Sequence, residues 1–95
     1  MIRLIVRYHV KKDLRDEFYE AIIREGIDEA SRKDPGNIQY DYYMYTEDDN
    51  EMVLLEAWES EEALCNHAKQ PHLEVVRELG KQYCDNVTVE KYITE

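Results

Sequence analysis

Residues 2–22 read IRLIVRYHVKKDLRDEFYEAI, and this stretch decides the fold because its apolar period changes partway along. Residues 2–10 place an apolar side chain at every second position, which is typical of a β-strand with one buried face. The polar residues 11–13 interrupt that alternation. From Leu14 onward, apolar residues recur every three or four positions, which predicts an amphipathic helix with Asp13 as its N-cap.

The predicted helix continues well past residue 22. Its apolar stripe is formed by Leu14, Phe18, Ala21, Ile22, Ile27 and Ala30. Gly26 lies inside this helix, where glycine costs about 1 kcal/mol relative to alanine. The sequence Asp34-Pro35-Gly36 is expected to end the helix and to form a turn. The first third of the chain therefore predicts one strand followed by one long helix.

The middle of the chain predicts a β-hairpin. Residues 37–46 read as a strand that is unusually rich in tyrosine. Its tyrosines fall on two faces, with Tyr40 and Tyr42 on one and Tyr43 and Tyr45 on the other. Residues 47–50 are all polar and suit the connecting loop. The partner strand is expected at residues 52–59, and both of its faces are largely apolar.

The last third predicts an interrupted helix and a final strand. Ser60 is the expected N-cap, and the acidic residues that follow it suit the positive end of a helix. Pro71 interrupts this helix and suits the first position of a new one. Gly80 is expected to end the second helix early, and residues 86–94 alternate as a strand.

The element order is therefore β-α-β-β-α-β, which predicts a ferredoxin-like α+β fold in a single domain spanning residues 1–95. The sheet should be four-stranded and antiparallel, with helices on one face only. Its other face still carries apolar side chains, namely Ile5, Val53, Leu55 and Val89. Since such a patch is costly in water, we expect a homodimer that buries this sheet face.

Composition excludes several classes of partner. The net charge is −10, from 22 acidic and 12 basic residues, so the chain should repel nucleic acid and anionic membranes. No apolar run approaches the roughly 20 residues that span a bilayer, and the charged N-terminus does not resemble a signal peptide. Cys65 and Cys84 show no CxxC pattern, which favours two reduced thiols in a cytoplasmic protein.

The segment from Glu56 to His72 carries the residues best suited to chemistry, including the only tryptophan and two of the three histidines. Glu56 and Trp58 stand two apart on a strand and so share a face. His67 follows in the next helix, where its imidazole can approach the indole and act as a base. Tyr40 and Tyr42, together with Trp58, would supply an aromatic wall for a planar substrate.

Structural roles compete with each of these assignments. Trp58 could be a plain core residue, and Glu56 could belong to a structural ion pair. His67 could cap the interrupted helix, and His72 could serve turn geometry after the proline. The two histidines stand five apart across the helix break, but no third ligand is evident, so no metal site is predicted.

These residues form a pattern that resembles the antibiotic biosynthesis monooxygenase family, in its quinol-monooxygenase-like branch. The shared elements lie in order along the chain: the Pro35-Gly36 turn, a strand with Tyr40, Glu56 two before Trp58, the helix start Ser60-Glu61-Glu62-Ala63, and His67 followed by Pro71-His72. The resemblance implies a dimeric α/β barrel with one pocket per subunit, between sheet and helices. Some members of that family oxygenate quinols without metal or flavin, others degrade haem, and one branch isomerises a phosphorylated autoinducer-2 signal.

One departure from the family pattern argues against haem degradation. The haem-degrading members place an asparagine on the first strand, where this chain offers Val6 and Tyr8 and no asparagine. The propionates of haem would also meet a strongly acidic protein. The resemblance therefore favours the quinol-oxygenating members.

The resulting prediction is a cofactor-independent monooxygenase that acts on a small quinol or related aromatic molecule. The predicted catalytic residues are His67, as base, and Glu56, as its polar partner. The predicted substrate-binding residues are Trp58, Tyr40, Tyr42, Tyr8 and His72.

Two alternatives stay open. An acid–base isomerase of a small hydroxy-ketone would use the same histidine and glutamate without oxygen. Its phosphorylated substrate would want clustered basic residues, whereas Arg3, Arg7 and Lys69 are scattered along the sequence. A non-enzymatic dimer that binds a small ligand is the other alternative.

Overall fold

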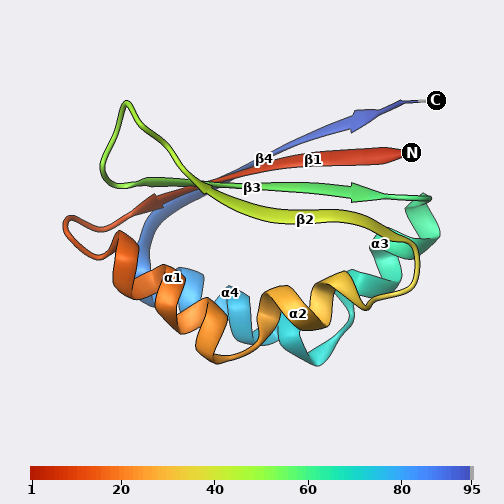
Figure 1. Cartoon of the computed structure of the whole chain (residues 1–95), viewed down its shortest axis with the longest axis horizontal. Helices are drawn as coiled ribbons and strands as arrows, with labels where there is room; N and C mark the ends of the chain where they lie inside the picture. The colour runs from red at the N-terminus through yellow and green to blue at the C-terminus, as the bar shows by residue number, and fades with distance from the viewer. Residues whose placement is uncertain (95) are drawn as a thin grey trace.

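The computed structural model describes residues 1–94 and shows one sheet covered on one side by helices (Figure 1). The elements in chain order are β1 (Ile2–Val10), α1 (Arg15–Arg24), α2 (Ile27–Arg32), β2 (Asn37–Met44), β3 (Glu51–Trp58), α3 (Glu61–Ala68), α4 (Pro71–Tyr83) and β4 (Cys84–Ile93). The strands are antiparallel in the order β2-β3-β1-β4. The predicted ferredoxin-like α+β fold is confirmed.

The core fills the space between the helices and the inner face of the sheet. Its buried apolar side chains include Ile2, Val6, Val10, Ile22, Ile27, Leu54 and Val76. Phe18 of α1 lies between two tyrosine rings, with centroid distances of 5.2 Å to Tyr8 and 5.6 Å to Tyr83. This aromatic cluster fixes the first and last helices against β1.

The long first helix that the sequence predicted is in fact two helices. Gly26 adopts a left-handed φ of 69° and stands between α1 and α2. A left-handed residue cannot continue a right-handed helix, so the glycine ends α1 instead of merely weakening it.

The prediction of Asp13 as N-cap is also wrong. Asp13 has a φ of 66° and its backbone N–H donates to Asn50 Oδ1, while Leu14 precedes the first turn.

The second half follows the predicted pattern more closely. Ser60 caps α3, since its hydroxyl accepts a hydrogen bond from the Ala63 backbone N–H at 3.1 Å. Pro71 opens α4 as expected. Gly80 does not end α4, because the helix continues to Tyr83, whose ring packs in the core. The last strand starts directly at Cys84, two residues earlier than predicted.

The strand register corrects the expected position of Val89. Val89 pairs with Val6, and residues directly opposite in an antiparallel pair share a face, so Val89 lies on the helix side. It is nevertheless 60% exposed. The opposite face of the sheet carries Ile5, Val53 and Leu55, as predicted. Among residues 1–94, no helix is both long and apolar enough to cross a membrane.

Candidate functional site

A cavity of about 690 Å³ lies between the helix side of the sheet and the helices α3 and α4. Its size falls within the range of small-molecule sites. Most of its wall is apolar and includes Val6, Tyr8, Leu64, Leu73, Val76, Val87 and Val89. Glu56 of β3 and His67 of α3 are buried polar residues in this wall, with 7% and 2% of their surface exposed. Glu56 and His67 therefore form a buried pair of titratable groups in the wall of this cavity.

The imidazole of His67 is held at one edge and free at the other. Its Nδ1 lies 2.7 Å from Oδ2 of Asp34, a short hydrogen bond in which an imidazole N–H donates to a carboxylate. That bond leaves Nε2 as the unprotonated acceptor nitrogen. Within residues 1–94, Nε2 has no hydrogen-bond partner. Its nearest charged neighbour is Glu56 Oε1 at 3.7 Å, which is too long for a hydrogen bond.

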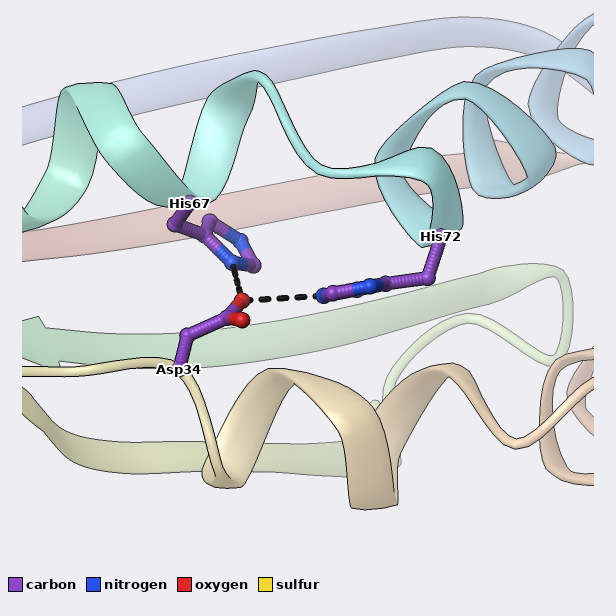
Figure 2. Close-up of side chains that lie close together, drawn as sticks. All are labelled: Asp34, His67 and His72. Carbon is purple, nitrogen blue, oxygen red and sulfur yellow. Dashed lines mark hydrogen bonds and ion pairs between the residues drawn. The ribbon is translucent and has the colours of Figure 1, made fainter.

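Asp34 is the residue of this site that sequence reasoning missed. It was interpreted only as part of the turn after the first helices, yet its Oδ2 also lies 2.9 Å from Nε2 of His72. Figure 2 shows the three side chains converging from the turn, from α3 and from the start of α4. The available signal was its position directly before the Pro35-Gly36 turn, which belongs to the family pattern.

The turn that carries Asp34 is fixed by Gly36. This glycine has a φ of 83°, and a Cβ built on it would lie 2.5 Å from the Cβ of Ala63. Only glycine therefore allows the turn to approach the first turn of α3 so closely. The Glu59 N–H donates to the Gly36 carbonyl at 2.8 Å and completes the contact. This packing brings Asp34 to the helix that carries His67.

Glu56 is poised to exchange a proton near neutral pH. Its Oε1 accepts a hydrogen bond from the Trp58 indole N–H at 3.0 Å. Burial raises the pKa of Glu56 to about 7, against the opposing effect of the Trp58 hydrogen bond. Burial also lowers the pKa of His67, although the hydrogen bond that its Nδ1–H donates to Asp34 acts in the other direction. Near neutrality, a neutral imidazole thus faces a carboxyl group that is partly protonated.

The predicted aromatic residues occupy two different positions. Tyr8 lines the cavity, whereas Trp58, Tyr40, Tyr42 and His72 are not among its lining residues. Trp58 is fully buried behind His67, and the Tyr40 ring lies 5.6 Å from the imidazole. Burial raises the pKa of Tyr40 to about 12, so its phenol stays neutral. These side chains surround the imidazole, and their contact with substrate stays a prediction.

Comparisons with known proteins converge on one family. The family model described as "Antibiotic biosynthesis monooxygenase" matches residues 1–79. A Bacillus subtilis (strain 168) protein named "Putative monooxygenase YcnE" is 32% identical over 82 residues, which are 86% of this chain and 84% of that protein.

Two solved structures share the whole fold. The "Putative antibiotic biosynthesis monooxygenase from Nitrosomonas europaea" has a TM-score of 0.88 at 25% identity, covering 99% of this chain and 98% of that chain. A conserved protein from Methanosarcina mazei Go1 has a TM-score of 0.89 at 24% identity, covering 99% and 92%. The latter likeness concerns the fold alone.

Proposed function

Because this chain belongs to the antibiotic biosynthesis monooxygenase family, we propose that it oxygenates a small quinol or related aromatic molecule without a cofactor. The observation that carries the proposal is His67 in the wall of an apolar cavity, with a buried Nε2 that has no hydrogen-bond partner within residues 1–94. A buried nitrogen without a partner is costly, and a substrate hydroxyl that donates to it would remove that cost. Its position supports a role as general base.

The proposed reaction needs no external reductant. His67 Nε2 accepts the proton of a phenolic hydroxyl, and the electron-rich anion then reduces oxygen and forms a bond from a ring carbon to one oxygen atom. The O–O bond breaks, and the second oxygen atom leaves as water. A hydroquinone and O₂ thus give a hydroxyquinone and water, with both further electrons drawn from the substrate.

The neighbouring residues have defined roles in this proposal. Asp34 is a positioning residue, since its carboxylate holds the His67 Nδ1–H and leaves Nε2 facing Glu56, which also lines the cavity. The protonated form of Glu56 supplies a proton to the departing oxygen, for which a pKa of about 7 is suitable. The apolar wall would pack against the ring of the substrate.

One observation favours a second candidate function. Two acid–base groups stand 3.7 Å apart in one cavity, which also suits proton transfer between neighbouring carbons of a small hydroxy-ketone. Such an isomerase would turn over without oxygen. Anaerobic assays therefore separate the two functions.

The test is oxygen uptake with a panel of hydroquinones. We expect uptake with wild-type protein and with His9→Gln, a histidine on the far face of the sheet, and a loss of about 10²- to 10⁴-fold in His67→Gln. Equal rates for wild type and His67→Gln would remove His67 from the mechanism. Substrate binding without uptake by wild-type protein would contradict the oxygenase proposal.

We also propose that the chain pairs with a second copy through the sheet face away from the helices. That face exposes Tyr43 and Tyr92 by 48% and 49%, beside the apolar residues Ile5, Val53 and Leu55. Burying such a surface would add stability that a chain of 95 residues can use.

A further inference from the structure

We propose that Asp34, His67 and His72 form a binding site for a divalent metal ion of the zinc class. The two histidines are separated by a helix break, and the sequence showed no third ligand for them. Asp34 supplies that ligand, because one of its oxygens contacts a nitrogen of each imidazole. The three ligand atoms all lie within 4.8 Å of one another. Two imidazoles and a carboxylate are a common donor set for catalytic zinc and non-haem iron.

Two of the three distances between ligand atoms require only a small adjustment on binding, and the third, between His67 Nδ1 and His72 Nε2, is within 4.8 Å. The Asp34 oxygen lies 2.7 Å from His67 Nδ1 and 2.9 Å from His72 Nε2. Ligands at zinc bond lengths in tetrahedral geometry stand about 3.3 Å apart, so each contact would open by about half an ångström. In the metal-free chain, the two hydrogen bonds keep the ligands together. Folding has therefore already ordered the three ligand side chains, so binding of the ion loses little further conformational entropy.

The surroundings of His67 match those of a metal-bound histidine. Such a histidine almost always donates its second ring N–H to a carboxylate or carbonyl group. Here the second nitrogen, Nε2, faces Glu56 Oε1 at 3.7 Å and has no other partner within residues 1–94. Glu56 is itself fixed by the Trp58 indole N–H at 3.0 Å. With a metal on Nδ1, the Nε2–H would point at this carboxylate.

The ion would lie at the Nδ1 edge of the imidazole, outside the cavity. His67 lines the cavity, whereas Asp34 and His72 do not. The side chain of His72 is 16% exposed, which leaves a route for the ion and for a water molecule in the fourth position. The proposed metal site and the proposed substrate site therefore share the His67 imidazole.

Binding there would have a definite effect on His67. The ion takes the place of the proton on Nδ1, and the neutral ring then carries its proton on Nε2. Nε2 changes from an acceptor into a donor and can no longer accept a substrate proton. Only this inhibition rests on the proposed function, since binding of the ion does not depend on any reaction.

The binding test is calorimetric titration of the untagged protein with zinc chloride. We expect one ion per chain in the wild type, and at least a tenfold loss of affinity in both Asp34→Asn and His72→Gln. Glu56→Gln should lose about 10- to 100-fold, because it removes the acceptor behind the ligand. His9→Gln is the matched control and should bind as the wild type does. Zinc binding that is absent, or unchanged in both ligand variants, would overturn the proposal.

Nitrogen-15 spectroscopy of the histidines gives an independent readout. Zinc should move the proton of His67 from Nδ1 to Nε2, and the same addition should leave His9 unchanged. If Asp34→Asn fails to fold by circular dichroism, His72→Gln carries the test. An unchanged His67 tautomer at saturating zinc would contradict the site. If zinc binds as described but no quinol is oxygenated, the metal site stands and the proposed function falls.

Discussion

Trp58 lies directly behind His67, with the two ring centroids 4.3 Å apart and the ring planes inclined by 34°. The indole also donates its N–H to Glu56. One buried side chain thus supports the imidazole with its ring face and fixes the carboxyl group with its edge. Its place in the site is that of a scaffold for both titratable groups.

Replacing Trp58 by phenylalanine should separate these two contributions. Phenylalanine keeps a ring beside the imidazole but leaves Glu56 without its donor, which should cost about 1 to 3 kcal/mol in the free energy of unfolding. Because the Trp58 hydrogen bond lowers the pKa of Glu56 against the effect of burial, that pKa should rise further. Urea unfolding and a carbon-13 titration of the glutamates measure the two effects. An unchanged titration of Glu56 would contradict this account.

Glu56 should make the stability of the protein depend on pH. Its pKa is raised by burial to about 7, from an ordinary value of about 4.3. The folded chain therefore holds one proton more than the unfolded chain between these values, so stability falls as the pH rises through this window. Glu56→Gln lacks the effect, and the wild type should lose roughly 3 kcal/mol relative to it between pH 4 and pH 8. Parallel stability curves for the two proteins would show that the carboxyl group is not buried as described.

Asp34→Asn should lower the pKa of His67 while leaving the imidazole close to its present position. Burial already lowers the pKa of His67, and the Asp34 hydrogen bond opposes that effect. Removing the negative charge should therefore lower the pKa further. Proton resonances of the imidazole, followed against pH, measure the shift, with His9 as internal reference. A pKa that rises or stays constant would mean that Asp34 does not hold this ring.

Gly36→Ala should destabilise the fold, whereas Gly80→Ala should not. The first substitution meets the Ala63 Cβ and a left-handed φ, and both effects together should cost roughly 2 to 4 kcal/mol. The second places its Cβ in open space within α4 and should gain up to about 1 kcal/mol. Thermal and urea unfolding compare the two. Equal stability of both variants would show that the turn does not depend on its close approach to α3.

Leu55→Lys tests the proposed pairing of two copies. Leu55 lies opposite Ile5 on the sheet face away from the helices, so a charge there should reduce the mass measured by sedimentation from two chains to one. Val75→Lys is the control, since Val75 is a 38% exposed apolar residue of α4. A wild-type mass equal to one chain would contradict the dimer.

The fold was largely predictable because its signals are local. The alternation in residues 2–10, the serine cap at Ser60 and the proline at Pro71 act within a few residues of themselves. The errors at Asp13 and Gly26 concern residues that adopt left-handed φ angles. The helical spacing of apolar residues continues across such a residue, so the sequence pattern does not reveal that the helix is broken there.

The site was predictable where it depends on spacing and unpredictable where it depends on packing. Glu56 and Trp58 stand two apart on one strand, and the structure joins them by a hydrogen bond. Asp34 and His67 stand 33 positions apart, and they meet because Gly36 lets a turn rest against a helix. No local pattern contains that contact, so Asp34 was interpreted only as a turn former.

The cavity wall divides along the chain. Glu56 and His67 fall within residues 1–79, the part that the family model matches, whereas several lining residues, from Gly80 to Val89, lie beyond it. The proposed acid–base pair and part of the proposed substrate wall therefore belong to different segments of the chain. Replacing residues 80–94 by the corresponding segment of another family member should therefore change the cavity wall and leave Glu56 and His67 in place.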